Sequence, residues 1–420
     1  MTYQRRIVDD ELDELFVQLS AILLDGPKAV GKTTTALQRC QIIRRLDRAA
    51  ERAVIEADPR VIANDPQPIL IDEWQRVPEI WDTVRGLIDE DKTAGRYLLT
   101  GSAPLTGTHS GAARIAGVRL RPLALSERGR GTPTVSFRGL LSGKRPNIAG
   151  RTGLILTDYV DEIVAGGFPG MRHLTGRALN KQFDSYLDRI VTHDMPEAGF
   201  RVSRPAAVRA WMAAYAAASA TTASWETLRD AASAGYDAKP SREAVTNYTN
   251  LLTQLRILDP IEAWLPTANH FNRLGSAPKH HLADPALAVR LLKRTRHHLL
   301  RGDDGPLVVT RDGTLLGALF ESLVALSVRG FAQAAGAETF HLRDKNGRHE
   351  VDFIVEYEGR VLGLEAKLKG DIKDQDVRHL TWLQNQMGDR IIDAAVITTG
   401  PEAYRRSDGI AVIPLGALRL

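Results

Sequence analysis

The sequence predicts an α/β fold in which a parallel sheet comes first, a helical region follows, and a mixed α/β domain ends the chain. Apolar runs of strand length, "AILLD", "PILID" and "RYLLTG", alternate with helical stretches in the N-terminal part, as expected for strands buried on both faces of a parallel sheet. Residues 201–265 are alanine-rich and helical in pattern, and two strand-like runs joined by "EGR" predict a hairpin near residues 350–367.

The composition is that of a globular protein with several domains. Of 420 residues, 43% are hydrophobic, and 55 basic residues nearly balance 51 acidic ones, so a nucleic-acid-binding surface would have to be local. The single cysteine, Cys40, cannot form an internal disulfide, which fits a reducing cytoplasm. We expect a cytoplasmic protein without a membrane partner, because charges such as Glu321 interrupt the most apolar segments.

The clearest motif is "GPKAVGKTT", which follows the first apolar strand and satisfies the pattern G-x-x-x-x-G-K-[ST]. The N–H groups of such a loop, at a helix N-terminus, surround a β-phosphate. Lys32 is expected to reach the β- and γ-phosphates, and Thr33 to coordinate magnesium. The next stretch, "TTALQRCQIIRRL", is expected to continue as a helix. The motif therefore predicts a nucleotide site.

Two later strands are expected to complete this site. "PILIDE" ends in two acids, where Asp72 would hold the Mg²⁺ shell and Glu73 would orient or deprotonate the attacking water. "RYLLTGS" ends in a polar tip, where Thr100 or Ser102 can sense the γ-phosphate. This order of strands is that of an additional-strand P-loop ATPase sheet. The expected nucleotide-binding residues are Gly26, Pro27, Lys28, Ala29, Val30, Gly31, Lys32, Thr33, Thr34 and Thr100.

With "YLLTGSAP" and "RLRPLALSE" in the same order, these motifs resemble a bacterial and archaeal family of AAA-type ATPases whose C-terminal half is the DUF4143 region. The resemblance covers nearly the whole chain and implies ATP as the nucleotide. In that family a Gly-Arg pair precedes "PLALSE", and its arginine would act as a finger on the nucleotide of a neighbouring subunit in a homo-oligomer. Here the pair is Ala113-Arg114, so Arg114 is the candidate finger and Arg119 the second choice, while a surface arginine without a catalytic role is the alternative for each.

Residues 131–200 are expected to form a linker and a helical lid-like segment. "RGRGTPTVSFRGLLSGKRPNIAGRTG" is dense in Gly, Arg, Pro and Ser, which predicts a flexible linking or inserted loop. "GGFPG" and the helix after it are similar to the start of the family's DUF4143 region. We assign structural roles to His193 and Asp194, because adjacent residues on a helix point apart.

Residues 201–270 resemble a winged helix-turn-helix. Ser241 is a suitable N-cap for its second helix. The residues of one apolar stripe on that helix are Val245, Tyr248, Leu251, Leu252 and Leu255. The residues expected to face DNA are Lys239, Arg242, Asn247 and Asn250. A helical packing module is an equal alternative, and many winged helices bind protein.

Residues 271–420 carry, in order, a basic helix "VRLLKRTRHHLL", a helix with Glu321, a strand with Asp352 and a strand with Glu365 and Lys367. From Glu321 onward this is the layout of a PD-(D/E)xK nuclease fold. Glu365 and Lys367, two residues apart on one strand, share a face. The acids are expected to bind one or two Mg²⁺ ions that activate water, and Lys367 to orient that water or neutralise charge. A solvated hairpin with an ion pair is the simpler alternative.

The predicted fold is therefore an AAA-type P-loop NTPase sheet over residues 1–130, then a helical and winged-helix module, then a restriction-endonuclease-like mixed α/β domain. The predicted function is an ATP-binding and ATP-hydrolysing protein whose nucleotide state controls a nuclease-like domain acting on nucleic acid, DNA rather than RNA. The predicted catalytic residues are Glu73, Arg114, Asp352, Glu365 and Lys367, and the metal ligands Thr33, Asp72, Glu321, Asp352 and Glu365. The alternative is an ATP-dependent, non-cleaving regulatory switch or toxin-antitoxin-like component that binds DNA or protein, and a scaffold with vestigial sites is a third.

Overall fold

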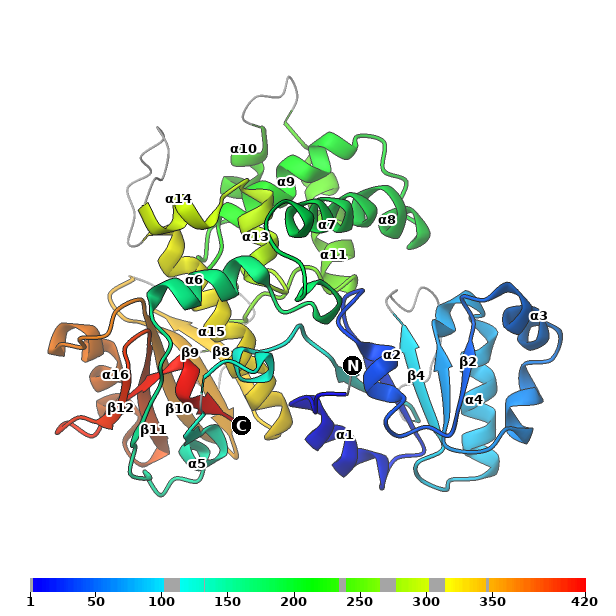
Figure 1. The fold of residues 1–420 in the computed structure, drawn as a ribbon, viewed down its shortest axis with the longest axis horizontal. Helices are drawn as coiled ribbons and strands as arrows, with labels where there is room; N and C mark the ends of the chain where they lie inside the picture. Colours follow the sequence, from blue (N-terminus) through cyan, green and yellow to red (C-terminus); the bar gives the residue numbers. More distant parts are fainter. Residues whose placement is uncertain are drawn as a thin grey trace.

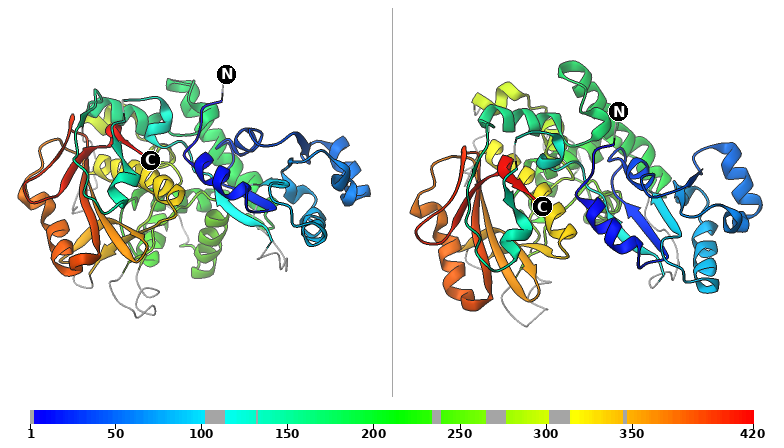
Figure 2. Two further views of the ribbon diagram at one scale, coloured as in Figure 1. Left: turned by 90° about the horizontal axis from the view of Figure 1, so that it is seen from below. Right: turned by 60° about the horizontal axis from the view of Figure 1, so that its bottom comes forward.

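The computed structural model describes residues 3–101, 114–131, 133–233, 239–264, 277–301, 314–344 and 347–420. In these residues the chain forms an N-terminal parallel sheet, a group of central helices and a C-terminal mixed sheet (Figure 1). Figure 2 shows the two sheets at opposite ends of the molecule, with α1 (Val8–Phe16) and α15 (Leu315–Ala334) between them. The predicted succession of a parallel sheet, helices and a mixed sheet is confirmed.

The N-terminal sheet has five parallel strands in the order β2-β3-β4-β1-β5. Its strands are β1 (Ala21–Asp25), β2 (Ile42–Arg45), β3 (Ile69–Asp72), β4 (Tyr97–Gly101) and β5 (Ala116–Arg119). Its helices are α2 (Lys32–Ala36), α3 (Ala49–Ala57) and α4 (Glu79–Glu90). Because β4 pairs with both β1 and β3, it separates the strand that leads into the glycine-rich loop from the strand that ends in Asp72.

One helix prediction in this region is wrong. The helix expected to continue through "TTALQRCQIIRRL" ends at Ala36, and Ile42–Arg45 is the edge strand β2. Ile42 and Ile43 pair with Ile69 and Leu70 of β3, and β-branched side chains fit such a pleated surface well. Pairing with a distant strand therefore outweighs the local helical pattern.

The central helices lie at the top of Figure 1, above the two sheets. They are α6 (Leu156–Ala165), α7 (Gly176–Arg189), a π-helical turn (Ile190–Asp194), α8 (Met195–Glu197), α9 (Pro205–Ala217), α10 (Trp225–Ser233), α11 (Arg242–Gln254), α13 (Pro285–Leu291) and α14 (Arg296–Arg301). The Ser241 hydroxyl accepts a hydrogen bond from Ala244 N at 3.1 Å, and the predicted apolar stripe of α11 is buried, so both features are confirmed. The basic helix expected from Val289 to Leu300 is instead divided between α13 and α14, because Lys293 takes a φ of 53°.

The C-terminal sheet has seven strands in the order β7-β12-β13-β11-β10-β9-β8. They are β7 (Gly150–Arg151), β8 (Glu338–Arg343), β9 (Glu350–Tyr357), β10 (Arg360–Lys367), β11 (Ile391–Thr398), β12 (Glu402–Arg405) and β13 (Ala411–Pro414). The predicted hairpin is β9–β10, and its turn residues Glu358 and Gly359 have φ values of 50° and 73°, as in a tight two-residue hairpin turn. Helix α16 (Asp374–Met387) packs on β10 and β11.

The segment expected to be a flexible linking loop is in part ordered into the C-terminal domain. β6 (Val135–Ser136) pairs with β14 (Leu418–Arg419), and β7 pairs with β12. Between them, α5 (Phe137–Leu141) buries Phe137 and Leu140 completely. The expectation is therefore wrong for residues 133–151, because a few apolar side chains within a Gly- and Arg-rich stretch are enough to dock it on a core.

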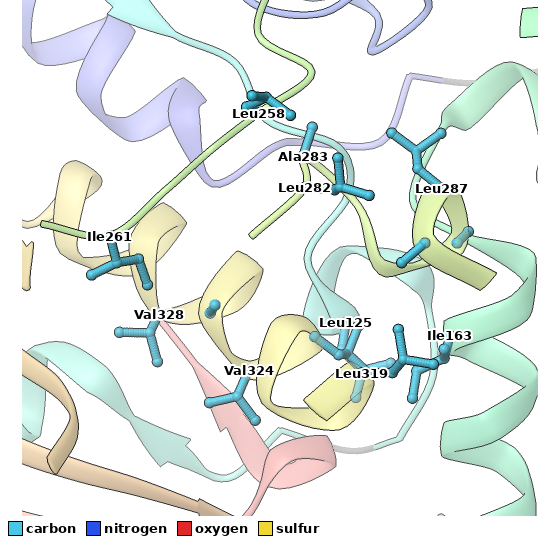
Figure 3. Close-up of a cluster of buried hydrophobic side chains, with 14 of the residues drawn as sticks. Leu125, Ile163, Leu258, Ile261, Leu282, Ala283, Leu287, Leu319, Val324 and Val328 are labelled. Atoms are coloured by element: carbon cyan, nitrogen blue, oxygen red, sulfur yellow. The ribbon is translucent and has the colours of Figure 1, made fainter. Parts of the chain in front are cut away.

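Helix α15 is the core helix of the molecule. It is long and apolar enough to cross a membrane, yet 67% of its apolar window is buried inside the structure. Figure 3 shows three of its side chains, Leu319, Val324 and Val328, within a cluster that also draws residues from the other regions. These other residues include Leu125, Ile163, Leu258, Ile261, Leu282, Ala283 and Leu287. The length and hydrophobicity of α15 are therefore explained by burial within the protein.

Asp259 connects the three regions through a buried ionic cluster. Its carboxylate lies 3.0 Å from guanidinium nitrogens of Arg119 and Arg121 and 2.6 Å from one of Arg329 on α15. Burial alone would raise the pKa of Asp259, but the charges of Arg119 and Arg329 outweigh burial and lower it. The cluster thus stays ionised, and the three arginines depend on one carboxylate.

We expect the substitution Asp259→Ala to lower the free energy of unfolding by about 3–5 kcal/mol, because it leaves buried guanidinium groups without a counter-charge. Urea denaturation followed by circular dichroism measures this loss. The control is Asp161→Ala, which removes the half-exposed ion pair with Arg296 and should cost only about 0–1 kcal/mol. Equal losses in the two variants would contradict the central role of Asp259.

Candidate functional site

The glycine-rich loop runs from the end of β1 to the start of α2. Gly31 has a φ of 99°, and a Cβ on Gly26 would lie 2.2 Å from the carbonyl oxygen of Leu120, so both glycines are required by the backbone. The Lys32 ammonium is buried and donates to the carbonyl oxygens of Gly26 and Pro27 at 2.8 and 3.0 Å. Burial lowers the pKa of Lys32 to about 8. The Lys32 side chain thus lies inside the loop that is predicted to bind the phosphates.

Asp72, at the end of β3, is held by two hydroxyl groups. Its Oδ1 accepts hydrogen bonds from Thr33 Oγ1 at 2.8 Å and from Thr100 Oγ1 at 2.5 Å. Thr100 is completely buried, so its hydroxyl positions Asp72, and a role as an exposed phosphate sensor does not follow from this geometry. The alternative sensor, Ser102, lies outside the described residues. The predicted meeting of Thr33 with Asp72 is present in the structure.

The donor set of Thr33 and Asp72 fits magnesium, because a hydroxyl and a carboxylate oxygen are adjacent and hard oxygen ligands suit this ion. Together with nucleotide, Mg²⁺ would neutralise charge that develops on the phosphates. Next to Asp72, Glu73 adopts a φ of 57°, and its Oε2 accepts a hydrogen bond from Gln75 Nε2 at 2.6 Å. The backbone thus turns Glu73 out of the strand direction immediately after Asp72.

Arg114 and Arg119 flank opposite ends of β5. The pairs Ile22↔Ala116 and Asp25↔Arg119 place Arg119 at the loop end of β1 and Arg114 before the other end. Arg114 Nε donates to Asp89 of α4 at 2.6 Å, so within its own subunit it lies away from the glycine-rich loop. The Arg119 guanidinium is committed to Asp259, which makes it a poor finger for another subunit.

The central helices contact the loop through Lys28. Its ammonium lies 2.7 Å from Asp194 Oδ1 and 3.4 Å from Glu197 Oε2, and its carbonyl oxygen accepts a hydrogen bond from Tyr186. The ion pair with Lys28 accounts for the burial of the Asp194 carboxylate. The ring of His193 lies 3.5 Å from the same carboxylate, so the expectation that these adjacent side chains point apart is wrong. The sequence contained no local signal for this link, since Lys28 and Asp194 are 166 positions apart.

In the C-terminal domain, Glu321 of α15, Asp352 of β9 and the pair Glu365 and Lys367 of β10 converge. Lys367 Nζ lies 2.7 Å from Glu365 Oε2, which confirms that the two side chains share a face. Asp352 Oδ2 accepts a hydrogen bond from the backbone N–H of Ala366 at 2.9 Å. With Glu350, these three acids form what we call the acid cluster, and the simpler alternative of a solvated hairpin is excluded because Asp352 and Glu365 are buried.

Lys279 is the functional residue that sequence reasoning missed. It is 0% exposed, and its ammonium lies 2.9 Å from Glu321 Oε1, 3.0 Å from Asp352 Oδ1 and 3.2 Å from Glu350 Oε1. Nothing in its local sequence, "KHHLADPALA", marks it. The available signal was indirect. The sequence predicted several buried acids but only one basic partner, Lys367, and buried carboxylates need a further counter-charge.

Burial and Lys279 have opposite effects on the acids. Burial, reinforced by the charge of Asp352, raises the pKa of Glu321, and burial raises the pKa of Glu365 well above its usual range. For Asp352, burial is outweighed by the Lys279 ammonium, which lowers its pKa. The same attraction overcomes burial at Lys279 and raises the pKa of its ammonium. Asp352 is thus the principal anion that faces Lys279.

The acid cluster does not fit a divalent metal in this arrangement. A cation, the ammonium of Lys279, already occupies the point at which Glu321, Glu350 and Asp352 converge. The buried oxygen Oε1 of Glu365 has no hydrogen-bond partner among the described residues, and one such oxygen falls short of the coordination that Mg²⁺ requires. The expected Mg²⁺ site at Glu321, Asp352 and Glu365 is therefore closed here.

The residues expected to face DNA lie on or before α11. Arg242, Asn247 and Asn250 are exposed, and the Arg242 side chain is 83% accessible. Lys239 and Arg242 both pair with Glu226, at 2.9 and 3.6 Å. All four residues are exposed, and three of them lie on α11.

Comparisons with known families match three parts of the chain. The AAA domain family matches residues 18–128, and two domains of unknown function, DUF8612 and DUF4143, match residues 156–298 and 316–418. The expectation that "GGFPG" begins the DUF4143 region is therefore wrong, because this segment lies in the DUF8612 match. The uncharacterized proteins Rv2008c of Mycobacterium tuberculosis and Mb2031c of Mycobacterium bovis are each 24% identical over 436 residues, covering 99% of this chain and 84% of the relative.

Two solved structures also show a distant likeness. The Walker-type ATPase PABY2304 of Pyrococcus abyssi is 15% identical with a TM-score of 0.40, and covers 69% of this chain and 96% of its own. Protein VC1899 of Vibrio cholerae is 13% identical with a TM-score of 0.20, and covers 94% of each chain. Because both TM-scores are below 0.5, neither structure supports an argument about this chain. The family matches to parts of the chain remain.

We expect the affinity for nucleotide to fall about tenfold between pH 7 and pH 9, because phosphate binds the protonated Lys32 and the pKa of that ammonium in the free protein is about 8. Titration with a fluorescent ATP analogue at each pH measures this change. Lys92→Ala, an exposed lysine outside the loop, should retain the pH dependence, and Lys32→Ala should bind weakly at every pH. A wild-type affinity that does not change with pH would contradict the assignment.

Proposed function

We propose that this chain, an AAA-type P-loop ATPase with a C-terminal DUF4143 domain, binds ATP and hydrolyses it. The observation that carries the proposal is the hydrogen bond from Thr33, next to the buried Lys32, to Asp72 across the intervening strand β4. The loop N–H groups and Lys32 would hold the phosphates, and the loop residues Gly26 to Thr34 form the binding surface. Glu73 would orient or deprotonate the attacking water.

We expect Glu73→Gln to lower kcat for ATP hydrolysis by about 10²- to 10⁴-fold while ATP still binds, because the amide cannot accept a proton from water. Release of phosphate and binding of a fluorescent ATP analogue are measured in parallel. Glu79→Gln, the same change at an exposed position of α4, is the control. Unchanged turnover in Glu73→Gln would remove Glu73 from the mechanism.

The same assay tests Arg114, which we propose acts on the nucleotide of a neighbouring subunit. If Arg114 is such a finger, the substitution Arg114→Ala should lower kcat about 10³-fold with little change in ATP affinity. Asp89→Ala removes only the ion-pair partner of Arg114 and should preserve turnover. Turnover of Arg114→Ala equal to that of wild type would leave Arg114 a surface ion pair.

We further propose a division into an ATPase core over residues 1–130, a linker and lid over 131–200, a winged-helix-like module over 201–270 and a nuclease-like domain over 271–420, with residues 133–151 docked on the last. Helices α9 to α11 followed by the bridges Leu258↔Leu282 and Ile261↔Lys279 support the winged-helix assignment. The antiparallel β8–β9–β10 meander that continues into the parallel β11 supports the restriction-endonuclease-like assignment.

The nucleotide state can reach the C-terminal domain through the segment after α11. Arg256 donates to Asp25, the residue before the glycine-rich loop, at 2.6 Å. Three residues later, Asp259 pairs with Arg119 and with Arg329 of α15. A change at the loop would therefore act on buried contacts that lead to the acid cluster.

For the C-terminal domain, cleavage of nucleic acid and non-cleaving binding are the two candidate functions. A cleaving domain would use Asp352, Glu365 and Lys367 as its catalytic set. The position of the Lys279 ammonium favours the second candidate, since it fills the place where a metal would bind. We therefore propose an ATP-dependent switch that binds nucleic acid, DNA rather than RNA, without cutting it.

We expect labelled duplex DNA to bind without cleavage in the presence of Mg²⁺ and ATP, and Arg242→Ala to weaken binding and reduce its salt dependence, because one phosphate contact is lost. Fluorescence anisotropy measures binding, and denaturing gels measure cleavage. Arg177→Ala, an equal charge change on α7, is the control. Cleavage that disappears in both Asp352→Ala and Lys367→Ala would instead establish a nuclease.

A further inference from the structure

The acid cluster is bridged to a part of the chain outside the region that DUF4143 matches. Lys279 lies in the region matched by DUF8612, whereas Glu321, Glu350 and Asp352 lie in the DUF4143 match. Its ammonium contacts all three carboxylates within 3.2 Å. This is the spacing of charge-assisted hydrogen bonds, so Lys279 is a full partner of the cluster.

The backbone holds Lys279 in place. Its N–H donates to the carbonyl oxygen of Ile261 at 2.8 Å, and its own carbonyl oxygen accepts from the N–H of Ile261 at 2.9 Å. On the same segment, Trp264 N–H donates to the carbonyl oxygen of His341 on β8 at 2.6 Å. The strand pair that carries Lys279 is thus attached to the sheet that carries Asp352, which places the backbone of Lys279 beside the acid cluster.

We propose that Lys279 is a resident cation that closes the acid cluster to divalent metal ions, so that the cluster acts as an ionic clamp between the regions matched by DUF8612 and DUF4143. Mg²⁺ binds carboxylate oxygens at about 2.0–2.1 Å in an octahedron, and it cannot share this position with an ammonium. Displacing Lys279 would leave a buried ammonium without its counter-charges. The inference goes beyond ATP hydrolysis and does not depend on it.

The first test needs no change at Lys279. Binding of Mn²⁺ to nucleotide-free, full-length protein is measured by electron paramagnetic resonance for the wild type and for Asp352→Asn. We expect the same number of bound ions in both proteins, because the cluster contributes no site. One additional ion in the wild type would overturn the proposal, and this result does not depend on ATP hydrolysis or on nucleic acid.

The second test opens the clamp with Lys279→Met, which keeps the length of the side chain and removes its charge. We expect the Tm of this variant to fall by about 5 °C or more without metal and to rise again with Mn²⁺, whereas the wild-type Tm should respond no more than that of Asp352→Asn alone. Adding Asp352→Asn to Lys279→Met should abolish the rescue. The control, Lys293→Met, removes an exposed lysine and should behave as the wild type.

Two results of the second test would contradict the proposal. A wild-type Tm that rises with Mn²⁺ as much as that of Lys279→Met would show that Lys279 does not exclude metal. If Lys279→Met folds and its Tm does not change with Mn²⁺, the acid cluster does not bind metal even without Lys279. Lys279 would then exclude nothing from the cluster. If Lys279→Met does not fold, the comparison of wild type with Asp352→Asn decides.

Discussion

The arrangement of the whole molecule depends on the buried carboxylate of Asp259. It neutralises Arg119 and Arg121 from the ATPase-like part and Arg329 from the core helix α15. Buried guanidinium groups without a counter-charge are strongly unfavourable, so the three regions can pack in this way only while Asp259 lies among them. The apolar contacts around α15, by contrast, are spread over many side chains and depend on none of them individually.

Two lysines illustrate the different use of buried charge at the two ends of the chain. Lys32 donates to the backbone carbonyl oxygens of Gly26 and Pro27, and burial lowers the pKa of its ammonium. Lys279 is surrounded by carboxylates, which raise the pKa of its ammonium. The same kind of side chain thus contacts backbone carbonyl oxygens in the glycine-rich loop and carboxylates in the acid cluster.

The meeting of the glycine-rich loop with Asp72 could be predicted from sequence, because both are local motifs whose approach follows from a general rule. The carboxyl ends of parallel strands lie at one edge of a sheet, so the loop after β1 and the acid at the end of β3 must approach each other. The hairpin of Glu365 and Lys367 was predictable for a similar reason, since the period of a strand is two residues.

The remaining features could not be predicted, because they depend on pairing across long separations in the chain. Residues 42–45 have a helical pattern but pair with β3, and residues 133–151 have a loop composition but complete the C-terminal domain. Lys279 lies 73 positions from Asp352, and periodicity reports nothing about contacts at such distances. The polar contacts between regions cannot be predicted from local patterns, because only the fold brings the paired residues together.

The position of Lys279 also has a consequence for the evolution of this architecture. Family boundaries separate Lys279 from the acids that it neutralises, as they separate Asp259 from Arg121 and Arg329. A gene fusion that exchanged one of these regions for an unrelated one would leave charges stranded inside the protein. The three regions are therefore expected to be inherited as a unit, and a change at one of these charged positions should select for a compensating change in another region.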